Sequence, residues 1–211
     1  MLKRVFLFLF LSSTSGFSAG APTDTLINSI QVAWDKISSY EAEFHQTVTS
    51  KGLGTREETQ GTLQVQKPLK LRWETPAQNS IQILNGSQLW QIRKSKRRKT
   101  TQVDHYRDIS KLVDARSLSF LSGKISIKKS YKYKILADSP KSVLLALTPL
   151  SGGLETYLAE ILKPSYSLGA LKIESPESET RIVFSNVRAN VSLPESLFQY
   201  EPGPQDVVQN N

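Results

Sequence analysis

The stretch from Gly61 to Trp73, G-T-L-Q-V-Q-K-P-L-K-L-R-W, decides the fold. Apolar and polar residues alternate up to a Lys-Pro pair, and the alternation resumes with Leu71 and Trp73. A period of two is typical of a strand with one apolar face and one solvent-exposed face. Because proline cannot donate a backbone N–H to a neighbouring strand, Pro68 predicts an edge, a bulge or a bend within the strand. We therefore expect this stretch to lie in a sheet with one buried face.

A second aromatic segment, Gly86-Ser87-Gln88-Leu89-Trp90, follows soon after. It places Trp73 and Trp90, two of the three tryptophans, on strands that we expect to be neighbours in one sheet. Such a sheet face has two interpretations. In the first, its aromatic residues, together with Trp34 and Phe44, form a packed core, which is their usual environment. In the second, they line a cavity for an apolar ligand. The residue pattern favours neither.

Helical and strand patterns alternate along the rest of the chain. A helix capped by Thr23 or Asp24 comes first, and helical spacing returns over residues 108–121. Residues 194–197 have the pattern of a single helical turn. The other segments have the period of strands, the last of them at 198–200, and the tail after Pro202 shows no pattern. So many consecutive strands with few helices predict an α+β domain built on a strongly curved antiparallel sheet or an open barrel.

Residues 1–20 have the layout of a secretory signal peptide, with two basic residues, an apolar run and then small residues. The run is shorter than the ~20 apolar residues of a membrane-spanning helix. We therefore expect cleavage after Gly20, with Ala19 as the alternative site, rather than an N-terminal membrane anchor. Two of the 27 lysines and arginines lie in this segment, so the mature chain has 25 against 19 acidic residues and a net charge of +6. Residues 21–211 fit a single exported domain of ordinary size.

Catalytic and metal-binding patterns are missing from the sequence. The chain has no cysteine and two histidines, His45 and His105, which lie far apart in sequence. An enzyme needs a nucleophile, a positioned base or a set of metal ligands. We therefore expect no catalytic activity, no metal and no cofactor. An exported hydrolase with a site of unfamiliar pattern is an alternative.

The densest charge in the chain is the segment R-K-S-K-R-R-K at residues 93–99. Because it follows the Trp90 strand, we expect it to form the tip of a hairpin. A solvated loop is one interpretation, and a docking surface for an acidic partner or anionic lipid head groups is another. Nucleic acid is not an expected partner, because no aromatic residues are interleaved for base stacking. The basic residues concerned are Arg93, Lys94, Lys96, Arg97, Arg98 and Lys99.

Short motifs over most of the mature chain resemble those of the LolA family, the periplasmic carriers of lipoproteins to the outer membrane. They follow the family's order, and the R-W-E segment with the later L-W is the most specific combination. The motifs are Ser38-Ser39-Tyr40 with Ala42, Phe44 and Gln46; Gly61-x-Leu63-x-Val65-x-Lys67-Pro68; K-L-R-W-E from Lys70 to Glu74; Asn85-Gly86 with Leu89-Trp90; Leu147-Thr148-Pro149; and Phe198-Gln199-Tyr200 with Pro202.

The resemblance implies an unclosed, strongly curved antiparallel β-barrel whose hydrophobic concave face is covered by α-helices. It implies a monomeric periplasmic carrier without catalytic activity. Such a carrier accepts an acylated lipoprotein from an inner-membrane ABC transporter of the Lol type, shields its acyl chains, and delivers it to a LolB-like outer-membrane acceptor where one is present. The basic hairpin tip is a candidate docking surface for these partners. An exported lipid- or lipoprotein-sensing regulatory or adaptor domain of similar fold is the alternative.

The resemblance also implies roles for individual residues. Phe120 and Leu121 fall on the segment that forms the lid, and Lys67 falls where well-known members carry an arginine that holds the empty cavity shut. Lysine keeps the charge but lacks the planar fork of donors, so we expect a weaker latch here. The residues expected to line the acyl-chain cavity are Trp34, Phe44, Leu71, Trp73, Trp90, Phe120 and Leu121.

Overall fold

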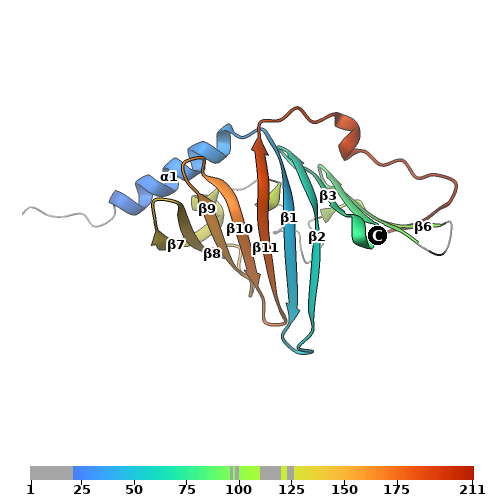
Figure 1. Ribbon diagram of the computed structural model, residues 1–211, viewed down its shortest axis with the longest axis horizontal. Helices are drawn as coiled ribbons and strands as arrows, with labels where there is room; N and C mark the ends of the chain where they lie inside the picture. Colours follow the sequence, from blue (N-terminus) through green and yellow to red (C-terminus); the bar gives the residue numbers. More distant parts are fainter. Residues whose placement is uncertain (1–20, 96, 98–99, 110–119, 123–125) are drawn as a thin grey trace, which may run out of the picture.

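The computed structural model describes residues 21–95, 97, 100–109, 120–122 and 126–211. The predicted signal peptide, three residues of the basic segment and most of the predicted helix at 108–121 lie outside these ranges. A helix packs near one end of a large curled sheet, and a long C-terminal segment crosses to the other end (Figure 1). Among the described residues, no helix has both the length and the apolarity needed to cross a membrane.

In the described ranges, twelve strands form one sheet, in the spatial order β12-β6-β5-β4-β3-β2-β1-β11-β10-β9-β8-β7. Neighbouring strands are antiparallel except for β12 and β6, which are parallel. The end strands β7 and β12 are not neighbours, so the prediction of an α+β fold with an unclosed, curved antiparallel sheet is confirmed. The strands are β1 (Ser39–Ser50), β2 (Arg56–Gln66), β3 (Lys70–Thr75), β4 (Ser80–Asn85), β5 (Gln88–Lys94), β6 (Thr101–Tyr106), β7 (Tyr131–Asp138), β8 (Ser142–Pro149), β9 (Thr156–Leu162), β10 (Ser167–Glu174), β11 (Ser178–Ala189) and β12 (Asp206–Asn210).

The stretch that decides the fold forms a hairpin. Strands β2 and β3 pair antiparallel, with Leu63 opposite Trp73. Residues Lys67 to Leu69 form the turn between them, and Leu69 has a left-handed backbone conformation with φ of 59°. Pro68 therefore lies in a turn, where its missing N–H removes no hydrogen bond from the ladder. The expected bend within one strand is instead a turn between two strands.

Helix α1 (Ala21–Lys36) covers one face of the sheet, which we call the inner face. Its apolar residues recur at helical spacing, so one stripe faces the sheet. Ile27 and Ile30 on this stripe are completely buried, and Trp34 packs on the same cluster. The helical residues Phe120 and Leu121, together with the short helix α3 (Ile127–Ser130), contribute to the same layer.

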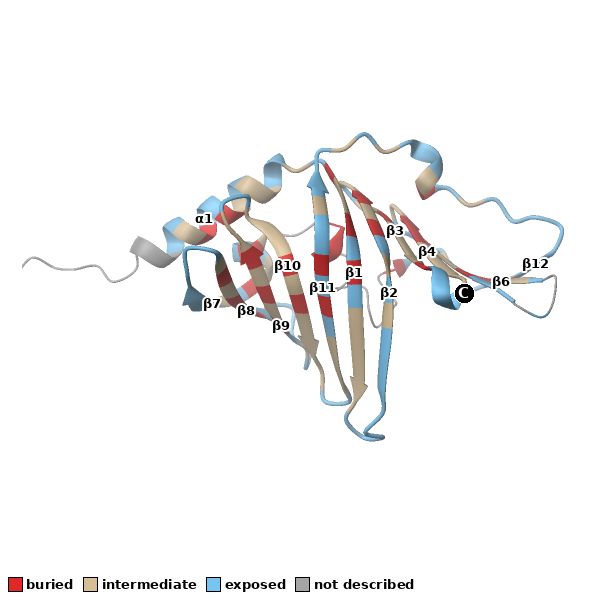
Figure 2. Ribbon diagram, viewed as in Figure 1, coloured by how far each residue is buried: buried red, intermediate tan, exposed pale blue. Residues whose placement is uncertain are grey.

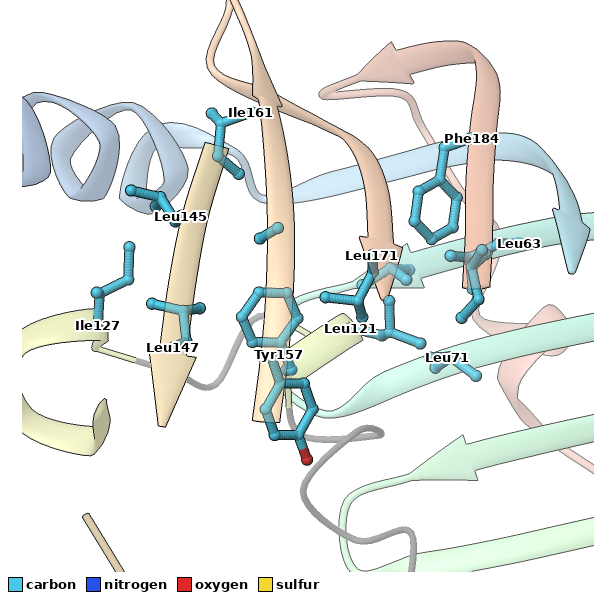
Figure 3. Close-up of a cluster of buried hydrophobic side chains, with 14 of the residues drawn as sticks. Leu63, Leu71, Leu121, Ile127, Leu145, Leu147, Tyr157, Ile161, Leu171 and Phe184 are labelled. Carbon is cyan, nitrogen blue, oxygen red and sulfur yellow. The ribbon is translucent and has the colours of Figure 1, made fainter. Parts of the chain in front are cut away.

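The core lies between the inner face and these helices, because each strand turns every second side chain inward. Figure 2 shows the buried residues gathered along the middle of the strands, and Figure 3 shows part of the cluster around Leu121. Full burial of one aliphatic side chain contributes about 1.5–3 kcal/mol. The buried strand residues are Ala42, Phe44, Leu63, Val65, Leu71, Leu84, Leu89, Tyr131, Val143, Leu145, Leu147, Tyr157, Ala159, Ile161, Leu171, Ile182 and Phe184.

A second, smaller cluster lies on the opposite face of the sheet, the outer face. Ile83, Ile92 and Val103 from β4, β5 and β6 form its buried centre. The C-terminal segment covers this cluster, since Tyr200 and Val208 pack against it. The C-terminal segment therefore covers the outer face of the sheet over β4, β5 and β6.

The C-terminal segment matches the sequence prediction in part. The helical turn expected at 194–197 is present as a 3-10 helix, η3 (Glu195–Phe198), but no strand forms at 198–200. The last strand is β12, in the tail that shows no sequence pattern, and Val208 in this strand lies opposite Val103 of β6. A further 3-10 turn, η1 (Pro76–Gln78), joins β3 to β4.

Candidate functional site

An apolar pocket lies between the inner face and its helical cover, near the C-terminal end of α1. Its volume is about 60 Å³. Helix α1, together with Phe120 and Leu121, forms the cover of this pocket. The lining residues come from the cover, from the start of β1, from the β2–β3 turn and from β10 and β11: Trp34, Ile37, Tyr40, Ala42, Lys67, Phe120, Leu121, Ser167, Leu168, Phe184, Val187 and Ala189.

Aromatic contacts join the two parts of the cover to each other and to the sheet. The rings of Trp34 and Phe120 meet edge to face, with centroids 5.7 Å apart. Phe120 also approaches Tyr131 at 6.3 Å and Tyr157 at 6.1 Å. Contacts of this geometry contribute about 0.5–1.5 kcal/mol beyond the area they bury. Phe120 therefore holds the cover against the strands beneath it.

Four side-chain hydrogen bonds hold the cover against the sheet. The Lys67 ammonium donates to the backbone carbonyl of Trp34. The Tyr40 hydroxyl donates to the carbonyl of Leu121 at 2.5 Å. The Trp34 indole N–H donates to the carbonyl of Tyr166, in the β9–β10 turn, at 2.6 Å. The Tyr133 hydroxyl of β7 donates to the Asp24 carboxylate of α1 at 2.6 Å. Each part of the cover is thus fixed by a donor that lines the pocket, and α1 is fixed at three points.

Burial shifts the acid–base equilibria of both pocket-lining donors on the sheet. It lowers the pKa of the half-buried Lys67 ammonium, because a charged group is disfavoured away from water, and the nearby Asp35 carboxylate partly opposes this shift. Burial raises the pKa of the Tyr40 hydroxyl, so the phenol stays protonated and remains a donor at physiological pH.

The lowered pKa of Lys67 predicts a pH dependence of stability. Between that lowered pKa and the ordinary lysine value of 10.5, the unfolded chain binds more protons than the folded chain. The contribution of Lys67 to the free energy of unfolding should therefore increase as the pH rises through this window. Denaturant unfolding of the wild type and of Lys67→Met across the window measures the difference between them. A difference that stays constant with pH contradicts the prediction.

The pocket is small while the cover is in place, and the closed form denotes this arrangement. A volume of about 60 Å³ leaves room for only a few water-sized groups. A long acyl chain has many methylene groups, each comparable in size to a water molecule, so it does not fit while the cover is in place. Binding such a chain requires Trp34, Phe120 and Leu121 to move away from the sheet.

Four of the predicted site residues line this pocket: Trp34, Lys67, Phe120 and Leu121. Three others belong to the same inner-face cluster without lining it. Leu71 is completely buried, and the rings of Phe44 and Trp73 lie against each other with centroids 3.8 Å apart.

The structure does not bring Trp90 to the pocket. Leu89 packs on the inner face with Leu84, which lies opposite it on β4. Consecutive residues of a strand point to opposite faces, so Trp90 points outward. It stacks on His105 with centroids 3.7 Å apart and contacts Tyr200 of the C-terminal segment. Strand β4 also separates Trp90 from Trp73, so the two tryptophans share neither a face nor neighbouring strands.

Sequence reasoning missed part of the pocket wall. Tyr40 and Ala42 line the pocket from β1, and the sequence predicted a pocket role for neither residue. Leu168, Phe184 and Val187 come from strands whose alternation was recognised. The pairing of β1 with β11 brings Phe184 opposite Phe44, and only this long-range pairing places these residues beside Lys67 and Trp34.

The predicted hairpin tip lies between β5 and β6, where the Ser95 N–H donates to the Thr100 carbonyl at 3.2 Å. Arg93 forms an ion pair with Asp104, and Lys94 is the last residue of β5. Arg97 is exposed, whereas Lys96, Arg98 and Lys99 lie outside the described residues. In the described ranges, no cluster of three or more histidines, aspartates and glutamates could hold a metal ion.

The geometry defines a class of protein, an open curled antiparallel sheet with an apolar pocket beneath a helical cover. The sequence matches the family "Outer membrane lipoprotein carrier protein LolA" over residues 35–201, which is most of the chain. The chain therefore belongs to the LolA family.

Two relatives and one solved structure illustrate the likeness. An outer-membrane lipoprotein carrier protein from Chromobacterium violaceum is 29% identical over 171 residues, covering 76% of each chain. One from Pseudomonas putida is 27% identical over 188 residues, covering 83% of this chain and 82% of that one. The crystal structure of an uncharacterized conserved protein from Thermus thermophilus has a TM-score of 0.52 at 10% identity, covering 90% of this chain and 99% of that one. That likeness shows the fold alone.

Proposed function

We propose that this protein carries lipoproteins by sheltering their acyl chains between the sheet and the cover. The observation that carries the proposal is the closed apolar pocket, whose cover is fastened by a few hydrogen bonds and aromatic contacts. Family membership and the names of the relatives support the carrier role. The protein performs no catalysis in this role, and its acyl-chain site includes Trp34, Phe120 and Leu121.

The physics of acyl chains explains why a carrier is needed. Each buried CH₂ group contributes about 0.8 kcal/mol, so the chains of a lipoprotein do not cross water unshielded at a useful rate. A carrier must offset this cost without binding so tightly that delivery fails. In the closed form, the cover occupies the apolar surface that the cargo would bind. Its hydrogen bonds and aromatic contacts must break before the cargo binds, and this cost limits the net affinity.

In the proposed route, the signal peptide directs the protein to the periplasm, where it acts as a monomer. It accepts acylated lipoproteins from an inner-membrane ABC transporter of the Lol type and delivers them to a LolB-like acceptor in the outer membrane. The basic hairpin between β5 and β6, with Arg93, Lys94 and Arg97, is the docking surface that we assign to these partners. Exposed cations at a hairpin tip can steer association with an acidic surface.

Native mass spectrometry tests the carrier function directly. The mature protein is mixed with the triacylated and the non-acylated form of one lipoprotein. We expect a one-to-one complex with the acylated form and no complex with the other. Equal binding of both forms, or of neither, would exclude an acyl-chain carrier and favour an adaptor or a regulatory domain of the same fold.

Lys67 acts as the latch of α1 in this proposal, and its removal should favour the open form. A hydrogen bond from a charged donor is worth about 1.5–3 kcal/mol, and the partial exposure of Lys67 favours the lower end. In Lys67→Met, a peptide with a plain alkyl chain should bind about tenfold more tightly, because a larger fraction of the protein is competent to bind. Fluorescence titration of a soluble hexadecyl ether peptide measures this affinity.

Lys70→Met is the matched control. Lys70 belongs to the neighbouring strand and forms an ion pair with Glu195 at 2.6 Å, away from the pocket. This variant should bind the peptide as the wild type does. Equal affinities of Lys67→Met and Lys70→Met would show that Lys67 is no latch.

A further inference from the structure

We propose that the Lys67 ammonium and the Tyr40 hydroxyl together form a binding site for the carbonyl oxygens of the cargo's acyl groups. The inference rests on the proposed carrier function and extends it to the polar end of the chains. In the closed form, both donors bind backbone carbonyls of the cover. When cargo enters, acyl carbonyls take the place of those backbone carbonyls.

Strand register brings the two donors together. Tyr40 lies opposite Val65 in the β1–β2 ladder, and the Lys67 N–H donates to the Ser38 carbonyl at 2.8 Å, two positions further along. Lys67 is therefore a diagonal neighbour of Tyr40, a relation that separates backbones by about 7–8 Å. Both side chains line the same pocket. Two long side chains at this spacing can reach neighbouring acceptors on one ligand.

The acceptors in the closed form come from both parts of the cover. Lys67 binds the Trp34 carbonyl of α1, and Tyr40 binds the Leu121 carbonyl. The Trp34 carbonyl also accepts the Ile37 N–H at 3.2 Å, so it keeps a partner when Lys67 leaves. Moving α1 therefore leaves the Lys67 donor, rather than the Trp34 carbonyl, in need of a new partner.

A donor left unpaired beside an apolar wall is costly, because burying a polar group without a hydrogen bond is unfavourable. An alkyl chain offers no acceptor to either donor. An acyl chain carries an ester or amide carbonyl where the chain meets its polar part, and a free fatty acid carries a carboxylate there. Among the described residues that line the pocket, these two are the only cationic or hydroxyl donors besides Ser167, so they set the preference for acyl over alkyl chains.

The electrostatics of Lys67 agree with this assignment. Burial disfavours the charged ammonium in the closed form, and the Trp34 carbonyl supplies only a neutral acceptor. A ligand oxygen with partial or full negative charge stabilises the ammonium more strongly than it stabilises a neutral donor. Lys67 should therefore contribute more than Tyr40 to the recognition of the acyl group.

A pair of probes tests the carbonyl site separately from the opening of the pocket. The same soluble peptide carries its chain either as a palmitoyl ester or as a hexadecyl ether, so the probes differ by one carbonyl group. Both need the same opening of the pocket, and the ratio of their dissociation constants, ether over ester, therefore reports the carbonyl contact alone. The ratio is measured by titration for the wild type, Tyr40→Phe and Lys67→Met. Tyr200→Phe, which loses a hydroxyl contact to Asp206 away from the pocket, is the control.

We expect the ratio to fall roughly threefold to tenfold in Tyr40→Phe and about tenfold or more in Lys67→Met, and to stay unchanged in Tyr200→Phe. Free palmitate forms a third arm. A loss confined to palmitate would assign the donors to a free carboxylate and overturn the acyl-ester assignment. A ratio that neither variant changes, with both probes still bound, overturns the carbonyl site but leaves the carrier function intact. If neither probe binds the wild type, the carrier proposal itself fails.

Discussion

Alanine in place of Gly61 is expected to remove most of the protein's stability. A Cβ atom at this position would lie 1.7 Å from the Glu74 carbonyl oxygen, 2.8 Å from the Glu74 carbonyl carbon and 3.0 Å from a ring carbon of Phe44. The two nearest atoms belong to the backbone of β3, which cannot rotate away as a flexible side chain can. The variant therefore has to separate β2 from β3.

That separation disturbs the centre of the inner face. Thr62, next to Gly61, lies opposite Glu74 in the ladder, and the Phe44 ring that the new methyl group would press upon is stacked on Trp73. We expect a loss of at least about 4–5 kcal/mol, which belongs to the exceptional range for single substitutions. A domain has only about 5–15 kcal/mol in total. Thermal and guanidinium unfolding followed by circular dichroism measure the loss.

Gly52→Ala is the control for glycine removal itself. No atom lies within 4 Å of a Cβ built on Gly52, in the β1–β2 turn. Its stability should stay within about 0.5 kcal/mol of the wild type. Comparable stability of the Gly61 and Gly52 variants would mean that β3 yields easily to the added methyl group. A large difference in stability between the two variants would show that the fold requires the glycine of the G-x-L-x-V-x-K-P motif.

Strand periodicity predicted the inner face well, because the pattern and its cause are both local. Ala42, Phe44, Leu63, Leu71 and Trp73 share that face as their alternation indicated. The pattern requires only that one side of each strand be buried, and nearest-neighbour hairpins then align the strands.

Periodicity could not place Trp90, because β5 is apolar on both sides. Leu89 and Trp90 are adjacent in sequence, and either could face the pocket until the register with β4 is known. The outer side of β5 is apolar because Tyr200 and Val208 cover it, and these residues lie far along the chain. No window of sequence around Trp90 contains that information.

The candidate site was likewise only partly predictable. The position of Lys67 beside Pro68 marked it as a latch by resemblance, but its acceptor, the Trp34 carbonyl, depends on where α1 ends. The role of Tyr40 depends on the Leu121 carbonyl, a backbone atom that no side-chain pattern reveals. Contacts to backbone carbonyls of distant segments are set by tertiary packing, so sequence motifs indicate the donors and the structure identifies the acceptors.

Phe198→Ala should be the second most destabilising change considered, and it should leave the pocket intact. Phe198 is completely buried, and its 3-10 helix η3 lies against β3 and β4. Truncating a buried phenylalanine costs about 3–5 kcal/mol, through lost apolar contacts and the cavity left behind. The Leu197 carbonyl beside it accepts a hydrogen bond from Arg72 at 3.2 Å, which holds only the backbone of η3.

The location of Phe198 separates this loss from any effect on cargo. The C-terminal segment packs on the outer face with Trp90, whereas the pocket lies on the inner face. In guanidinium unfolding, Phe198→Ala should lose about 3–5 kcal/mol, while the folded variant should bind an acylated peptide with wild-type affinity at low temperature. Val207→Ala is the control from the same segment, because Val207 is 62% exposed, and it should change neither quantity. Weaker peptide binding by the folded Phe198 variant would mean that the outer cover and the pocket are coupled through the sheet, and the two faces could no longer be treated as independent.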